Sequence, residues 1–264
     1  MSSIKRKHVV IILSILAILI IVGFGMWLSF NKANENIGLD KREPNLISVT
    51  PEAELNKGED NKTTPTPSPL PTAQVKESVT LTAPYTVQAP FANWAVHEES
   101  CEEAALLMYH YFLEGQTDFN GSSVIEQHGA ANDMLAMKNW QVKNYGREPD
   151  LTIEAWSKFA QEYYGYKPQT FKNITKEDIK KEIAAGHPVV VPVITHALEN
   201  PHYGRQPSYH VLIIKGYKPE GIITNDPGVK EGENYFYTWD ILFSAIDAQT
   251  SKMGQGREMA VIYK

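Results

Sequence analysis

Two β-branched runs near the C-terminus decide the fold class: residues 188–194, PVVVPVI, and residues 209–217, YHVLIIKGY. Apolar runs of this length, bounded by turn residues, predict buried strands. A third such run follows at residues 221–224, and shorter strands are expected at residues 235–237 and 259–263. We expect these strands to form one antiparallel sheet.

The sequence before these strands has helical periodicity instead. Helices are expected at residues 100–113, 131–144 and 152–164. A fourth helix begins at Thr175, which is a suitable N-cap, and ends just before Gly186. Because helices come first and strands later, the sequence predicts an α+β domain.

The chain of 264 residues divides into four segments by composition. Charge, apolar content and turn residues change near position 30 and again near position 80. We expect a cytoplasmic N-terminus at residues 1–8, a transmembrane anchor at residues 9–30, a linker at residues 31–80 and one domain at residues 81–264. The last segment has the size of a single domain with its own core.

The expected anchor, VVIILSILAILIIVGFGMWLSF, carries no charged side chain. About 20 apolar residues span the hydrocarbon core as a helix. A cleaved signal peptide is the alternative, but its apolar region usually has about 7–15 residues. Lys5, Arg6 and Lys7 precede the run, so the positive-inside rule places the N-terminus in the cytoplasm and the large domain outside the cell.

The expected linker contains residues 63–72, TTPTPSPLPT, in which proline alternates with small residues. Such sequence buries too little apolar surface to offset its ordering entropy, and proline favours an extended form. We expect this segment to hold the domain off the membrane.

Charge and motifs exclude several classes of ligand. The net charge is −6, and there is no basic stripe with interleaved aromatic residues, so nucleic acid is not an expected partner. There is also no glycine-rich phosphate loop and no dinucleotide fingerprint. His196, Glu199 and His202 form only a loose metal-site pattern, which Pro201 interrupts. We therefore expect no cofactor and no metal.

Cys101 is the only cysteine, which rules out a disulfide within the chain. Two interpretations compete, a buried core cysteine and a nucleophile. Ser100 and Glu103 match a capping box, which predicts Cys101 at the first helical position, where free N–H groups stabilise a thiolate. The Glu102 and Glu103 carboxylates oppose that charge, so a histidine partner has to provide most of the activation.

His210 is the candidate for that partner, because it lies at the start of an apolar strand that fixes its orientation. The alternative is a structural histidine near a sheet edge. The next strand ends at Asp226, and a hairpin through residues 218–221 brings both residues to the same end of the sheet. Asp226 is then placed to accept the second ring N–H and fix the tautomer.

These residues belong to a larger pattern. The chain resembles the C39-like peptidases of the papain superfamily, especially the stand-alone bacterial branch. The resembling residues are Gln88-Ala89-Pro90, Asn93-Trp94, Ser100-Cys101-Glu102-Glu103-Ala104, Tyr209-His210-Val211, Gly216-Tyr217 and Asn225-Asp226-Pro227-Gly228. The resemblance implies a papain-like fold and a Cys101–His210–Asp226 triad.

The resemblance also implies that Gln88 helps to bind the oxyanion. Bacteriocin-processing relatives place this glutamine much closer to the cysteine, whereas thirteen positions separate Gln88 from Cys101 here. The intervening residues have to loop out for Gln88 to take this role.

The expected function is therefore that of a membrane-anchored cysteine peptidase acting on a peptide or protein substrate outside the cytoplasm. Two alternatives remain open. One is a surface module that has lost activity and binds a peptide or cell-wall fragment, and the other is a transglutaminase-like acyltransferase, which shares the first chemical step.

Overall fold

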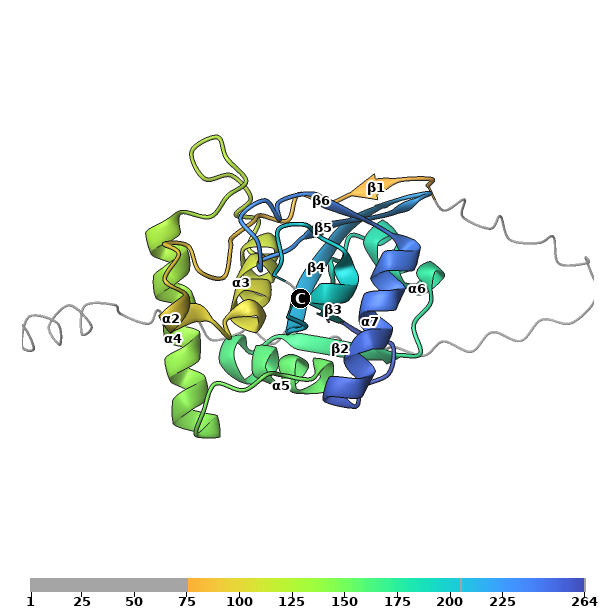
Figure 1. Cartoon of the computed structure of the whole chain (residues 1–264). Coiled ribbons are helices and arrows are strands. Elements are labelled where there is room, and N and C mark those ends of the chain that lie inside the picture. Colours follow the sequence, from red (N-terminus) through yellow and green to blue (C-terminus); the bar gives the residue numbers. More distant parts are fainter. Residues whose placement is uncertain (1–75, 205, 264) are drawn as a thin grey trace, which may run out of the picture. The chain divides into compact units, whose positions relative to one another are not determined.

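The computed structural model describes residues 76–204 and 206–263 (Figure 1). The expected cytoplasmic N-terminus, the expected anchor at residues 9–30 and nearly all of the expected linker lie outside the described residues. Among the helices that are described, none is long and apolar enough to cross a membrane.

The centre of the domain is a seven-stranded antiparallel sheet with strand order β2-β7-β3-β4-β5-β6, and β1 pairs with β4. The strands are β1 Val79–Thr80, β2 Lys167–Lys172, β3 Val189–Ile194, β4 Tyr209–Lys218, β5 Gly221–Asn225, β6 Tyr235–Thr238 and β7 Glu258–Tyr263. β4 and β5 form the expected hairpin, and Ile213 pairs with Asn225. Because β1 pairs with β4, residues 79–80 belong to the sheet of the domain and not to the expected linker.

Helices flank the sheet (Figure 1). They are α2 Trp94–His97, α3 Cys101–Leu113, α4 Gln127–Tyr145, α5 Ile153–Tyr164, α6 Lys176–Ala184 and α7 Trp239–Met253, with a 3-10 helix, η1, at Thr195–Leu198. α6 starts with a complete capping box between Thr175 and Asp178. α4 starts earlier than expected because the Glu126 side chain accepts hydrogen bonds from the backbone N–H groups of His128 and Gly129.

Five elements were not expected from the sequence, namely β1, α2, β2, η1 and α7, and β2 and α7 are the longest of them. β2, KPQTFK, is a mostly polar strand at the edge of the sheet, so it lacks the apolar run that marks β3 and β4. α7 begins directly after β6, with Thr238 as its N-cap. The order of elements is therefore more mixed than helices followed by strands, although the α+β class holds.

Two apolar clusters fill the space on the two faces of the sheet. α3 and α5 contribute to the first cluster, and α6 and α7 to the second. In β4, Val211 and Ile213 belong to the first cluster. Leu212 and Ile214 belong to the second. β4 is thus covered on both sides, which explains its continuous apolar sequence.

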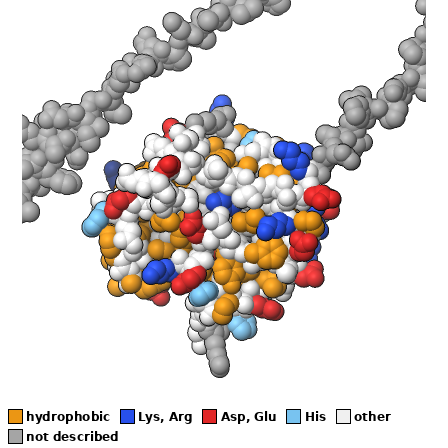
Figure 2. All heavy atoms as spheres, turned by 90° about the horizontal axis from the view of Figure 1, so that it is seen from above, with side chains coloured by type: hydrophobic (Ala, Val, Ile, Leu, Met, Phe, Trp, Pro, Cys, Tyr) orange, Lys and Arg blue, Asp and Glu red, His pale blue; other side chains and the backbone are white. Residues whose placement is uncertain are grey.

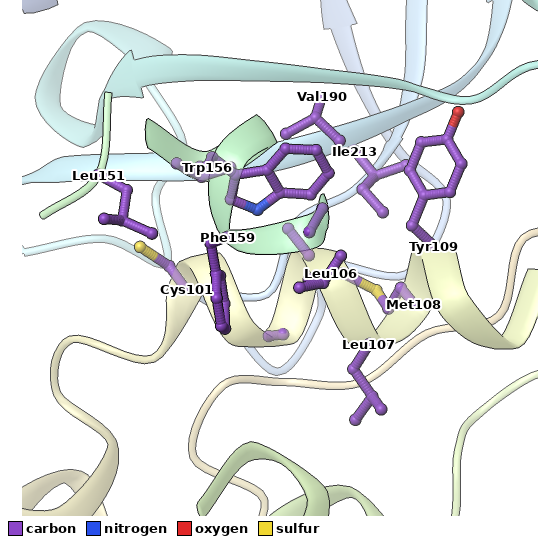
Figure 3. Close-up of a cluster of buried hydrophobic side chains, with 14 of the residues drawn as sticks. Cys101, Leu106, Leu107, Met108, Tyr109, Leu151, Trp156, Phe159, Val190 and Ile213 are labelled. Carbon is purple, nitrogen blue, oxygen red and sulfur yellow. The ribbon is translucent and has the colours of Figure 1, made fainter. Parts of the chain in front are cut away.

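Figure 3 shows the first cluster, with Cys101 at the start of α3, Leu106 further along that helix, and Trp156 and Phe159 from α5 packed beside it. α3 is buried around most of its circumference, because every residue from Cys101 to Tyr109 is buried. This packing fixes the position of the helix N-terminus, and with it the position of the Cys101 backbone.

Candidate active site

Cys101 is the first residue of α3, as expected, but the capping box predicted there is wrong. The Ser100 side chain does not cap the helix. Its hydroxyl donates to Glu148 Oε1 at 3.2 Å and contacts His97 Nδ1 at 3.1 Å. Glu103 points into the protein and accepts a hydrogen bond from the Gln141 side-chain amide. Both residues are buried and find tertiary partners, so the local capping pattern does not form.

The Cys101 side chain is 4% exposed and lies at the edge of the first apolar cluster. Its thiol donates to Glu102 Oε2 at 2.8 Å. Burial raises the pKa of the thiol well above its usual range, and the neighbouring Glu102 carboxylate raises it further. A hydrogen bond from the Val211 backbone acts in the opposite direction. This hydrogen bond places the Cys101 sulfur beside Val211, which directly follows His210 in β4.

His210 lies at the start of β4, and Asp226 directly follows β5. His210 Nε2 and Asp226 Oδ1 are 2.8 Å apart, and both side chains are buried. Since an ionised carboxylate only accepts hydrogen bonds, Nε2 carries the hydrogen in this pair. Nδ1 is then the ring atom available to take a proton from a thiol.

Asp226 has three further donors. Tyr203 donates to Oδ1 at 2.5 Å, Tyr237 donates to Oδ2 at 2.7 Å, and the Gly228 backbone N–H donates to Oδ1 at 3.1 Å. Burial alone would raise the pKa of Asp226, but the His210 charge and the hydrogen bonds from His210, Tyr203 and Tyr237 outweigh it and lower the pKa below its usual value. The carboxylate is therefore held in its charged form.

Tyr203 and Tyr237 were not predicted from the sequence, because neither lies in a recognisable motif. Tyr203 follows η1, and its ring packs edge-on against His210 with centroids 5.7 Å apart. Tyr237 is held in turn by Asn200, whose amide donates to its hydroxyl at 2.7 Å. The one signal was Gly228, since a Cβ there would lie 2.2 Å from the Tyr203 hydroxyl oxygen.

Gln88 is buried, and its backbone N–H donates to Pro227 O at 2.8 Å. Its side-chain nitrogen donates to His97 O at 3.1 Å and Glu98 O at 2.8 Å. The residues between Gln88 and Cys101 do loop out, and they include the short helix α2. Gln88 thus ties the segment before α3 to the turn after β5, with both amide hydrogens engaged.

One cavity brings these residues together. Its lining includes Gln88, Cys101 and His210, and also Tyr203 and Glu99. Cys101 reaches it from the α3 side of the sheet. His210 and Asp226 lie with Tyr203 and Tyr237, which pack with the cluster on the α7 side. The cavity is therefore lined by both the nucleophile candidate and His210, and Asp226 is hydrogen-bonded to His210.

Charges on the rest of the domain are mixed. On the face seen in Figure 2, the acidic and basic side chains of the described residues are interspersed with apolar ones. Within residues 76–204 and 206–263, no group of three or more His, Cys, Asp or Glu side chains is arranged to hold a metal ion. His202 instead lies 3.4 Å from Glu231.

Two solved structures are similar to this chain. A structure described as a C39-like peptidase from Bacillus anthracis is 14% identical over 72% of this chain and 99% of its own, with a TM-score of 0.47. Xylellain, a cysteine protease from Xylella fastidiosa, is 15% identical over 75% of this chain and 91% of its own, with a TM-score of 0.31. No curated protein matches.

The sequence match to a family model is the more informative comparison. The model described as "Peptidase_C39 like family" matches residues 80–252, a stretch that contains Gln88, Cys101, His210 and Asp226. Because this match covers well over half of the 264 residues, the chain belongs to the Peptidase_C39 like family.

Proposed function

We propose that this protein is a cysteine peptidase that hydrolyses peptide bonds through Cys101, His210 and Asp226. The observation that carries the proposal is the 2.8 Å contact between His210 Nε2 and Asp226 Oδ1 beside a cavity that Cys101 also lines. A histidine that is oriented by a buried carboxylate and lines the same cavity as a thiol supplies the groups that nucleophilic acyl transfer requires.

In the proposed reaction, His210 Nδ1 takes the proton of the Cys101 thiol, and the sulfur attacks the carbonyl carbon of the substrate. The tetrahedral intermediate collapses as the protonated His210 donates its proton to the leaving amine. Water, deprotonated by His210, then attacks the thioester and releases the acid, and the thiol regains a proton. Asp226 stays ionised throughout and stabilises the imidazolium.

The oxyanion is proposed to bind at the Cys101 backbone N–H and at the Gln88 amide. Gln88 has to exchange one of its present hydrogen bonds for the oxyanion, and the longer bond, at 3.1 Å to His97 O, is the better candidate. One such donor typically contributes about 3 kcal/mol to the transition state.

The test uses the full-length protein and an electrophilic peptide that labels thiols. Cys101 is the only cysteine, so any thiol label has one possible position. We expect the wild type to take up one label and to hydrolyse a peptide library, and Cys101→Ala to do neither while keeping its circular dichroism spectrum. Hydrolysis that persists in Cys101→Ala would contradict the proposal.

The same experiment separates the alternative functions. Products analysed with and without an added amine distinguish hydrolysis from acyl transfer to that amine. A wild-type protein that binds peptides but neither takes up the label nor turns over substrate is a binding module instead.

We also propose that residues 9–30 anchor the protein in the membrane, with the peptidase domain outside the cell. The support is the uncharged 22-letter run after three basic residues. The full-length protein should stay with membranes after a high-salt wash, and protease added to intact cells should release the domain. A domain that the protease reaches only after lysis would contradict this topology.

A further inference from the structure

Glu102 directly follows the candidate nucleophile, and its side chain is almost completely buried at 1% exposure. Oε1 accepts a hydrogen bond from the Leu151 backbone N–H at 2.8 Å. Oε2 lies 2.8 Å from the Cys101 sulfur. Figure 3 shows Leu151 beside the Cys101 side chain at the start of α3. The carboxyl group is therefore held in place by the backbone, with one oxygen fixed against the reacting atom.

Burial and the neighbouring acids disfavour a negative charge on Glu102, whereas the hydrogen bonds from the Cys101 thiol and the Leu151 N–H favour it. The titratable groups that act on it or respond to it are Cys101, Glu103, Asp150 and Tyr209, all of which are acids. Burial raises the pKa of Glu102 to about 8, and Asp150 contributes in the same direction.

A thiolate and a carboxylate in contact would place two like charges side by side in a buried site, which is strongly unfavourable. One proton therefore has to stay between Cys101 and Glu102 when the nucleophile forms. Hydrogen bonds to an ionised group are stronger than those between neutral groups, so a carboxylic acid is well suited to stabilise the sulfur anion.

We propose that Glu102 is a further catalytic residue, a neutral carboxylic acid that donates a hydrogen bond to the Cys101 thiolate. This inference rests on the proposed role of Cys101. The thiol proton moves to His210 Nδ1, and the Glu102 proton stays on its own oxygen and turns toward the sulfur. When the sulfur forms the thioester, the Glu102 hydrogen bond weakens, and no proton is gained or lost by Glu102. The residue thus favours the step in which the thiolate forms.

The test measures the rate of Cys101 alkylation by iodoacetamide as a function of pH, which needs no turnover. Glu102→Gln keeps a donor near the sulfur and cannot ionise, whereas Glu102→Leu removes the donor. At about pH 6 we expect Glu102→Gln to react within about threefold of wild type, and Glu102→Leu to react about tenfold or more slowly, as expected for loss of one hydrogen bond to a charged group. At about pH 9, wild-type Glu102 is ionised, so Glu102→Gln should react about tenfold faster than wild type.

Glu154→Gln is the matched control, because Glu154 is an exposed carboxylate in the first turn of α5. It should follow wild type at every pH. If Glu102 were ionised at about pH 6, Glu102→Gln would already react about tenfold faster there, and that result would overturn the inference. A Glu102→Gln rate well below wild type at both pH values would overturn it too, even if Glu102→Leu failed to fold.

Peptide hydrolysis is assayed on the same samples. If alkylation behaves as expected and wild type hydrolyses no peptide, the Glu102–Cys101 hydrogen bond stands and the peptidase proposal fails. If hydrolysis depends on Cys101 while alkylation contradicts the expectation, the peptidase proposal stands and the role of Glu102 fails.

Discussion

On the α7 side of the cavity, the Asp226 carboxylate accepts hydrogen bonds from His210, Tyr203, Tyr237 and a backbone N–H. On the α3 side, the Glu102 carboxyl is equally buried but accepts one backbone hydrogen bond and contacts a thiol. The His210 charge and the hydrogen bonds from His210, Tyr203 and Tyr237 lower the pKa of Asp226, while burial raises that of Glu102 to about 8.

The difference teaches that burial alone does not decide the charge of a carboxyl group. The number and kind of donors around it decide whether the desolvation cost is offset. Two carboxyl groups whose pKa values are pushed apart, and which contact Cys101 and His210 at one cavity, are suited to different roles, one as a charged partner of a base and one as a neutral donor.

The largest effect on peptide hydrolysis is expected from removing the negative charge of Asp226 on the α7 side. Asp226→Asn keeps the size of the side chain but loses the negative charge that fixes the His210 tautomer. We expect kcat/KM for peptide hydrolysis to fall by roughly 10³–10⁴-fold. Asp240→Asn, an exposed carboxylate in the first turn of α7, is the control and should keep wild-type activity. Asp226→Asn with activity near wild type would show that His210 is oriented by something else.

A smaller effect is expected from the two tyrosines. Tyr237→Phe and Tyr203→Phe each remove one donor from Asp226, so its pKa should rise. The acidic limb of the pH profile of kcat for peptide hydrolysis should therefore shift to higher pH. In each variant kcat itself should fall by about tenfold. Tyr145→Phe, whose hydroxyl contacts Glu162 outside the cavity, should leave the profile unchanged. Tyrosine variants with a wild-type acidic limb would show that the donor count does not control Asp226.

The smallest predicted effect concerns the free energy of unfolding, and it comes from Glu103, a second buried carboxyl group on α3. Glu103 Oε2 and Gln141 Oε1 are buried, and within the described residues neither has a partner. A protonated Glu103 would satisfy both, by donating to the amide oxygen while the amide donates back. Burial raises the pKa of Glu103 well above its usual value.

Because the folded-state pKa of Glu103 is raised, its contribution to stability depends on pH. A folded-state pKa above the unfolded value of about 4.3 gives a contribution to stability that is complete at lower pH and is lost as pH rises through the folded pKa. Glu103→Gln forms the same reciprocal pair with Gln141 without ionising. The free energy of unfolding of Glu103→Gln, measured with urea, should equal that of wild type at about pH 4.5. At about pH 8 it should be higher than that of wild type by about 1–3 kcal/mol.

Glu177→Gln, an exposed carboxylate in the first turn of α6, is the control and should track wild type at both pH values. If Glu103→Gln is no more stable than wild type at about pH 8, Glu103 is not held in its neutral form.

Part of the fold and of the site could be predicted from the sequence. β3, β4 and β5 are each built around a run of β-branched and other apolar residues, and Thr175 and Asp178 specify the start of α6 locally. Cys101, His210 and Asp226 stood out because each lies at an element boundary within a recognisable family pattern.

The remainder depends on contacts between distant segments. β2 is a polar edge strand that is defined by its pairing with β7, so its own sequence carries little signal. Tyr203 and Tyr237 reach Asp226 from different elements. Ser100 and Glu103 matched a capping box, but both side chains find tertiary partners that the local pattern does not contain.

The protonation states of Glu102 and Asp226 can be measured directly by infrared difference spectroscopy. The spectra are recorded at about pH 6.5, below the pKa of about 8 for Glu102. Relative to wild type, Glu102→Gln should lose a carbonyl-stretch band of a protonated carboxylic acid, and Asp226→Asn should lose only carboxylate bands. A spectrum in which Glu102→Gln loses carboxylate bands, or Asp226→Asn loses the protonated band, would contradict the opposite charge states on the two sides of the cavity.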